Sequence, residues 1–109
     1  ACEAVAARIN DRLQRKAVRA AQCHIGRKNE IEALVSHAER EMGGIDILVS
    51  NAGNGGATRA IPTPFAEMDP RDWKRYVDIN FYAVLNGIHA VLPGMRARRR
   101  GRIITIASD

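Results

Sequence analysis

The segment at residues 46–53, Asp-Ile-Leu-Val-Ser-Asn-Ala-Gly, has the pattern of a ligand-binding strand end. Its apolar run ends abruptly in a small polar residue that is followed by Asn51 and Gly53. Ligands of open α/β sheets bind just beyond the carboxyl ends of such strands, and Gly would let backbone approach a ligand closely. The alternative is a simple turn, in which Gly53 supplies a positive φ and Asn51 bonds locally. The segment alone leaves both interpretations open.

Asn80 and Ser108 are the other side chains that could carry chemistry. Asn80 stands in a long apolar stripe, where a buried amide without partners costs about 1–3 kcal/mol. It is therefore expected either to bond locally at a helix irregularity or to join a catalytic network. Ser108 follows a mostly apolar run, so it is either a turn former or, beside a pocket, an acid or oxyanion contact.

The composition predicts one globular domain without a membrane span. The 109 residues are 46% hydrophobic, which is enough for a core, and no run approaches the roughly 18 apolar residues of a membrane helix. The amino-terminal residues do not resemble a signal peptide, so a cytoplasmic location is expected. Cys2 and Cys23 lack the spacing of a metal or redox motif, so we expect free thiols and no metal site.

The net charge of +5 comes largely from an arginine cluster at residues 96–102. Cations in the last turn of a helix meet the negative end of its dipole, which accounts for the cluster without any polyanion. Nucleic-acid binding would be favoured by interleaved aromatic residues, but these make up only 5% of the chain. We therefore expect no nucleic-acid partner.

Hydrophobic periodicity predicts the helices and strands that would position these residues. Apolar residues at helical spacing predict a helix over 3–13 and another from about 29 to 42, which Gly43 and Gly44 end. Residues 17–25 and 45–49 are predicted strands, and the continuous apolar run of the second predicts cover on both faces. Residues 53–64 are predicted to form a loop over the ligand crevice.

A long helix is predicted after this loop. Asp69 is the expected cap, Pro70 occupies the first helical position and Asp72 the first turn. An apolar stripe continues to about residue 99, and residues 102–108 form another predicted buried strand. Helices and strands that alternate in this way are typical of an α/β protein with a parallel sheet.

Taken in order along the chain, these features resemble the short-chain dehydrogenase/reductase family. Residues 44–53 are similar to the strand with the family's NNAG element, with Ser50 in place of the first Asn. Residues 78–80 resemble the helical segment with the catalytic Asn, and residues 101–108 the strand that ends in the catalytic Ser. His24 departs from the pattern, because members usually carry there an Asp that bonds the adenine amino group.

The resemblance implies part of a doubly wound, Rossmann-type parallel sheet in a three-layer α/β/α domain that binds NAD or NADP. It implies hydride transfer between this cofactor and a small-molecule alcohol or carbonyl substrate. Asn80 would hold a water in a proton relay, and Ser108 would bond the substrate oxygen. A homo-oligomer, a dimer or tetramer, would assemble through the helix at 70–99. The cofactor-binding residues would be His24, Ile25, Asn51, Ala52 and Gly53.

Other landmarks of the family do not occur in the 109 residues. There is no G-x-x-x-G-x-G motif, and neither Tyr76 nor Tyr82 is followed four residues later by Lys. In the doubly wound order 3-2-1-4-5-6, two further strands would separate those at 17–25 and 45–49. Residues 1–109 are therefore expected to be a partial domain, the central part of an enzyme of roughly 250 residues, and inactive alone. A non-catalytic dinucleotide-binding or assembly module is the alternative.

Overall fold

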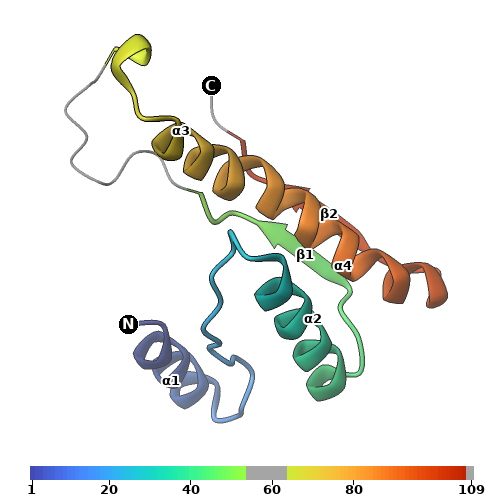
Figure 1. The fold of residues 1–109 in the computed structure, drawn as a ribbon. Helices are drawn as coiled ribbons and strands as arrows, with labels where there is room; N and C mark the ends of the chain where they lie inside the picture. The colour runs from blue at the N-terminus through green and yellow to red at the C-terminus, as the bar shows by residue number, and fades with distance from the viewer. Residues whose placement is uncertain (54–63, 108–109) are drawn as a thin grey trace.

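A computed structural model describes residues 1–53 and 64–107 of the chain (Figure 1). Within these ranges every helix is too short or too polar to cross a bilayer. Helices and strands alternate as the sequence predicts. In chain order they are α1 (Cys2–Leu13), α2 (Lys28–Met42), β1 (Ile47–Ser50), a 3₁₀ turn (Phe65–Glu67), α3 (Pro70–Val77), a π-helical segment (Asp78–Tyr82), α4 (Ala83–Ala97) and β2 (Arg102–Thr105).

The strands β1 and β2 form a parallel pair, with Ser50 opposite Thr105. Pairing continues beyond both ends, because Arg102 N donates to Asp46 O at 2.8 Å and Ile106 N donates to Ser50 O at 3.0 Å. Parallel strands need a long crossover, which here is the helical stretch from α3 to α4. The carboxyl ends of both strands therefore lie at the same edge of the sheet.

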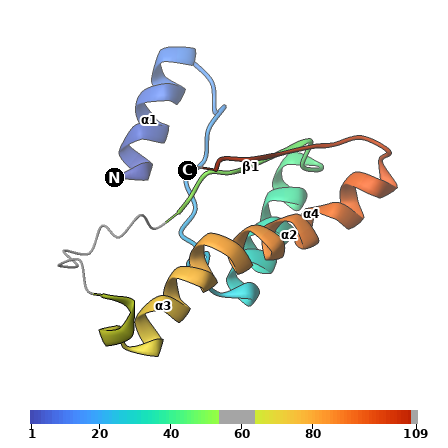
Figure 2. The ribbon, with the colours of Figure 1, turned by 90° about the horizontal axis from the view of Figure 1, so that it is seen from above.

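The helices that pack on the sheet cover one of its faces. α2 packs on α4 and α4 on β1, whereas α1 lies on the other side of the strands (Figure 2). Leu48 of β1 packs against the core, but Ile47 and Val49 on its other face are 60% and 53% exposed. The prediction of a parallel strand is confirmed. The prediction that both of its faces are covered is wrong for the described residues, because α1 makes no extensive contact with β1.

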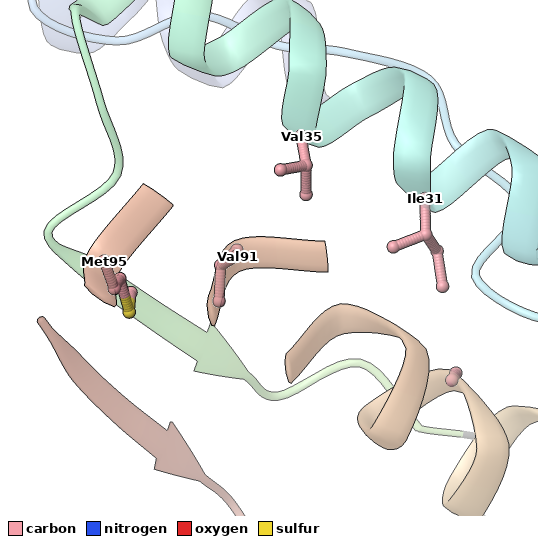
Figure 3. Close-up of a cluster of buried hydrophobic side chains, with 5 residues drawn as sticks. Ile31, Val35, Val91 and Met95 are labelled. Atoms are coloured by element: carbon pink, nitrogen blue, oxygen red, sulfur yellow. The ribbon is translucent and has the colours of Figure 1, made fainter. Parts of the chain in front are cut away.

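The buried core lies between α2 and α4 (Figure 3). Ile31 and Val35 of α2 face Val91 and Met95 of α4, and Ala83 completes the cluster. Val91 is the centre of this core, with none of its surface exposed. The predicted apolar face of the second helix is thus confirmed at Ile31 and Val35, because residues four apart lie on the same side of a helix.

The predicted strand at residues 17–25 does not form. Its backbone has no strand partner among the described residues, and the side chain of Asn10 serves part of it instead. Ala17 N and Val18 N donate to Asn10 Oδ1 at 2.7 and 2.8 Å, and Asn10 Nδ2 donates to Val18 O at 2.8 Å. The apolar pattern alone does not form a strand here, because a strand is stabilised by hydrogen bonds to a neighbouring strand. The doubly wound order puts two other strands between this segment and β1.

The last strand is shorter and more exposed than predicted. β2 ends at Thr105 rather than 108, and Ile104 and Ile106 are 46% and 57% exposed. Ser108 lies outside the described residues, as does most of the loop predicted at 53–64. The prediction of a buried strand is therefore wrong for these isoleucines, since no described helix covers their face of the sheet.

The helix α2 ends at the predicted glycine, and arginines follow the end of α4. Gly43 ends α2 in the left-handed region, at φ 77°, and its N–H donates to Glu39 O at 2.9 Å. Beyond α4, Arg98 Nη2 donates to Ile45 O at 2.7 Å and lies near Glu39, while the guanidinium of Arg100 pairs with Asp46 at 2.9 Å. These arginines of the basic cluster thus hold the carboxyl-terminal end of α4 against the start of β1.

The helix after the loop begins as predicted and is capped by Asp69. Its Oδ1 accepts from Arg71 N at 2.8 Å, and Pro70 occupies the first helical position. The Arg71 guanidinium, followed by the Arg71 backbone N–H, lowers the pKa of Asp69. The charged carboxylate therefore stabilises the fold above its unfolded pKa of 3.8, and this contribution disappears as the pH falls through the lower folded value.

We expect Val91→Ala to lower the free energy of unfolding by roughly 2 kcal/mol, because it removes two methyl groups from a fully buried site. Leu92→Ala is the matched control at the adjacent position, where the side chain is 38% exposed, and should cost less than about 1 kcal/mol. Urea denaturation of the full-length protein measures both changes. Equal losses in the two variants would contradict the assignment of Val91 to the core.

Asp69→Asn is expected to lower the melting temperature at about pH 7, and this effect should shrink as the pH falls below the unfolded pKa of 3.8 and through the lower pKa of the folded carboxylate. Asp72→Asn removes the same charge from the same helical turn and is the control. Thermal unfolding followed by circular dichroism at about pH 7 and at pH values below 3.8 tests this. A difference between parent and Asp69→Asn that does not shrink on acidification would contradict the linkage.

Candidate functional site

A cavity of about 200 Å³ opens at the carboxyl end of β1. Its inner part is apolar and is lined by α2, α4 and β1, whereas its outer part is lined by the last residue of β1, by the residues that follow it and by the segment before α2. The lining residues of the outer part are Cys23, Ile25, Ser50, Asn51 and Ala52. This is the sheet edge at which ligands of open α/β folds bind.

The predicted residues 51–53 lie at the mouth of this cavity. Asn51 and Ala52 line it, and all of residues 51–53 are exposed. Gly53 lies against Asn80 so closely that an added Cβ would be 3.0 Å from Asn80 Oδ1. The structure thus brings together two predicted site residues, Gly53 and Asn80, that are 27 positions apart in the sequence.

Asn80 lies within the π-helical segment Asp78–Tyr82, between α3 and α4. Its Nδ2 donates to Tyr76 O at 3.1 Å, one helical turn earlier. This hydrogen bond is local and lies at a helix irregularity, as one of the two interpretations from the sequence predicts, while the catalytic role of Asn80 stays a prediction. The expectation that it is buried is wrong, because the π-helical segment lies beyond the part of α4 that packs on α2 and leaves the side chain exposed at the sheet edge. Such π segments often occur at functional sites.

The segment with His24 and Ile25 borders the same cavity from the other side. Ile25 lines the cavity and packs against the core, whereas His24 is exposed and does not line it. His24 N donates to Glu30 Oε2 at 2.7 Å, and His24 Nδ1 accepts from Gly26 N at 3.2 Å. A Cβ added to Gly26 would be 3.6 Å from Ile79 Cγ1, so this turn lies next to the π-helical segment.

Glu30 and Cys23 are parts of this site that the sequence did not reveal. The pKa of Glu30 is lowered, first by the backbone N–H of His24 and then by the Arg27 side chain, so its carboxylate stays charged. Burial, followed by the charge of Glu30, raises the pKa of the Cys23 thiol, which therefore stays protonated near neutral pH. Neither residue belongs to a recognisable motif, and only the turn at residues 24–27, which leads into α2, brings them together.

Ser108, the predicted catalytic serine, lies outside the described residues. The chain before it can be followed to the sheet edge, where Ile106 N donates to Ser50 O at 3.0 Å beside the cavity. The described residues contain no group of three or more His, Cys, Asp or Glu side chains that could hold a metal ion.

Comparison with known proteins identifies the family. The model of the short chain dehydrogenases matches residues 1–109. A fatty acyl-CoA reductase of Mycobacterium tuberculosis is 41% identical over 88 residues, which cover 79% of this chain and 28% of that protein. An uncharacterized oxidoreductase of Staphylococcus saprophyticus is 34% identical over 102 residues, which cover 93% of this chain and 39% of that protein. This chain therefore spans about a quarter to two fifths of the length of these relatives.

Solved structures of similar proteins share the fold. A 7α-hydroxysteroid dehydrogenase in complex with NADH and 7-oxo glycochenodeoxycholic acid superposes with a TM-score of 0.78 at 32% identity, over 98% of this chain and 40% of that one. A 2-keto-3-deoxy-D-gluconate dehydrogenase of Streptococcus agalactiae gives a TM-score of 0.71 at 32% identity, over 93% and 36% of the two chains. The two-stranded parallel sheet with its packed helices is thus part of a Rossmann-type α/β fold. Because the family model matches all of residues 1–109, the chain belongs to the short-chain dehydrogenase/reductase family.

Proposed function

We propose that residues 1–109 are part of an NAD(P)-dependent oxidoreductase that interconverts a small-molecule alcohol and a ketone or aldehyde. The observation that carries this proposal is the meeting of Gly53 with Asn80 at the mouth of the cavity, at the carboxyl end of β1. The names of the relatives support the reaction class, since they include a fatty acyl-CoA reductase and an acetoacetyl-CoA reductase.

The residues at the cavity fit the adenosine end of a dinucleotide. Ile25 and Ala52 provide apolar contacts for a flat base, and Asn51 offers a polar side chain beside them. A Cβ at position 53 would crowd Asn80, so Gly53 lets the end of the strand lie against Asn80, and we assign its exposed backbone to the ribose. Ligand cavities usually measure roughly 300–1,000 Å³, so the observed 200 Å³ suits one end of the cofactor rather than all of it.

The apolar inner part of the cavity has a different role in this proposal. Leu34 of α2, Leu48 of β1 and Gly87 of α4 line it. The doubly wound order puts two further strands between β1 and the segment at 17–25. We therefore assign the inner part to side chains of the first strand of the sheet, in a longer protein of which residues 1–109 form one part.

The reacting groups are assigned to the opposite side of the mouth. The nicotinamide ring supplies or accepts the hydride when the cofactor is bound. Asn80 is exposed there and holds a water molecule through its amide, and Ser108 donates a hydrogen bond to the substrate oxygen. The reaction also needs a proton donor, which the resemblance to the family assigns to a Tyr that is followed four residues later by a Lys. Neither Tyr76 nor Tyr82 has this spacing, so we assign the donor to another part of the protein.

A non-catalytic binding or assembly module is the second candidate, because the helix from α3 to α4 exposes a row of apolar side chains. These are Trp73, Val77, Phe81, Leu85 and Leu92. Positions about four apart share one side of a helix, and such a row fits the homo-oligomer expected from the sequence. Titration of the full-length protein with NAD or NADP separates the candidates, since binding without turnover across a panel of alcohols and ketones would favour the module.

We also propose that the protein is cytoplasmic and that it has no nucleic-acid partner. The cysteines Cys2 and Cys23 are both free thiols, which supports the cytoplasmic location. Arg98 and Arg100 are bound to Glu39 and Asp46 within the fold, which supports a structural role for part of the basic cluster.

Ser108→Ala is expected to lower kcat of the full-length enzyme by about 10²–10³, because it removes a donor to the developing oxyanion. Asn80→Ala should also lower kcat and leave the dissociation constant of the cofactor nearly unchanged. Asn86→Ala, in the same helical stretch but away from the π-helical segment, is the control and should retain the parent activity. Steady-state kinetics and calorimetric titration measure these constants. Full turnover in both Ser108→Ala and Asn80→Ala would contradict the assignment.

Leu85→Glu is expected to weaken the oligomer, because it places a charge in the exposed apolar row. Asn86→Glu introduces the same charge at the neighbouring position of α4, which lies outside that row because adjacent helical residues are rotated by about 100°, and should leave the assembly intact. Light scattering coupled to size exclusion of the full-length proteins gives the molar masses. A monomeric parent, or an unchanged mass of Leu85→Glu, would contradict assembly through this helix.

A further inference from the structure

The arginine cluster at residues 96–102 divides into two sets. Arg98 and Arg100 form ion pairs with carboxylates of the fold. The guanidinium groups of Arg96, Arg99 and Arg102 form no ion pair with any residue that the structure describes. Arg102 Nη1 donates only to the carbonyl of the preceding residue, at 3.0 Å. Three charges of the cluster are therefore not neutralised within the described chain.

These three arginines line one open hollow of about 430 Å³. Arg96 comes from the last turn of α4, Arg99 from the turn after this helix and Arg102 from the start of β2. Arg100 also lines the hollow, and none of the described lining residues is Asp or Glu. Cations from three successive segments thus share one surface, which we call the arginine hollow.

The turn that brings these cations together contains a residue in an uncommon conformation. Arg99 has φ 54°, in the left-handed region that Gly usually occupies after a helix. Arg99 N donates to Arg96 O at 3.0 Å, and Arg100 N donates to Met95 O at 3.1 Å, which closes the turn. The backbone of this turn would accept glycine more readily, so the turn itself does not require a guanidinium group at position 99.

The arginine hollow also has an apolar part. Leu92 and Met95 of α4 and Ile103 of β2 line it beside the arginines. An added Cβ at Gly101 would lie 2.5 Å from Met95 Sδ, so the chain passes closely over this part. The described lining residues include no Phe, Trp or Tyr on which the bases of a nucleic acid would stack. A volume of about 430 Å³ falls within the range of roughly 300–1,000 Å³ that is usual for small-molecule sites.

We propose that the arginine hollow binds a soluble phosphate monoester that carries an apolar group. A phosphate monoester offers three strong acceptor oxygens, and guanidinium groups donate paired hydrogen bonds to such oxygens. Leu92, Met95 and Ile103 contact the apolar group. This site is separate from the cavity with Asn51, because it lies at the start of β2, whereas that cavity lies at the carboxyl ends of the parallel strands (Figure 1).

Calorimetric titration of the full-length protein with phenyl phosphate tests this proposal. We expect saturable binding, and we expect inorganic phosphate to bind at least about threefold more weakly because it has no apolar group to bury. Arg99→Gly should raise the dissociation constant of phenyl phosphate about tenfold, because it removes a charged donor. The same variant should not lower the melting temperature, since glycine suits the positive φ at this position.

Arg96→Gln is the second variant and should also raise the dissociation constant about tenfold, without a change of backbone conformation. Arg40→Gln is its matched control. It removes the same charge from the last turn of α2, outside the arginine hollow, and should change the dissociation constant by less than about twofold in physiological salt.

Absence of saturable phenyl phosphate binding to the folded parent would overturn the inference, as would an unchanged dissociation constant in both Arg99→Gly and Arg96→Gln. Displacement of phenyl phosphate by NAD or NADP would place it in the cofactor site and contradict a separate one. Sedimentation with vesicles of phosphatidylcholine and phosphatidic acid, without phenyl phosphate binding, would assign the arginines to a lipid surface and refute a soluble ligand. The inference does not rest on the proposed function, so each of these results leaves that function intact.

Discussion

The parallel pairing of β1 with β2 is the constraint on which the rest of this structure depends. Parallel strands must run in the same direction, so the chain between them has to return along the sheet, and here it does so as the helical stretch from α3 to α4. That return buries Val91 and Met95 against α2 and places residues 51 and 106 at one edge. The core and the candidate site are thus consequences of one topological requirement.

The π-helical segment within this crossover places Asn80 at the edge of the sheet where the candidate site lies. A regular helix would continue the same hydrogen bonding from Asp69 to Ala97, whereas the widened segment at Asp78–Tyr82 interrupts it beside the sheet edge. Asn80 is then tied to Tyr76 O and lies against Gly53, instead of packing with the apolar side chains that flank it in the sequence. Departures of this kind cost stability and are tolerated where a site requires them.

The departures from the expected fold have a common cause. Residues 17–25 lack a neighbouring strand, and Ile47, Val49, Ile104 and Ile106 lie on a sheet face that no described helix covers. In each case the apolar pattern describes an environment of several strands and helices, while the described residues provide only one helical layer and two strands. Asn10 partly compensates by bonding the backbone of Val18, as a neighbouring strand would.

Local sequence patterns were sufficient to predict the parallel β1, the end of α2 at Gly43, the start of α3 at Asp69 and the segments that form the candidate site. These features depend on local chemistry, such as a left-handed glycine or a capping carboxylate, which a few adjacent residues specify. The contact of Gly53 with Asn80, the place of Glu30 and Cys23 beside the site and the hydrogen bond from Gly26 N to His24 Nδ1 became visible in the folded chain alone. Such contacts join residues whose proximity depends on how whole elements pack, and no short stretch of sequence encodes that.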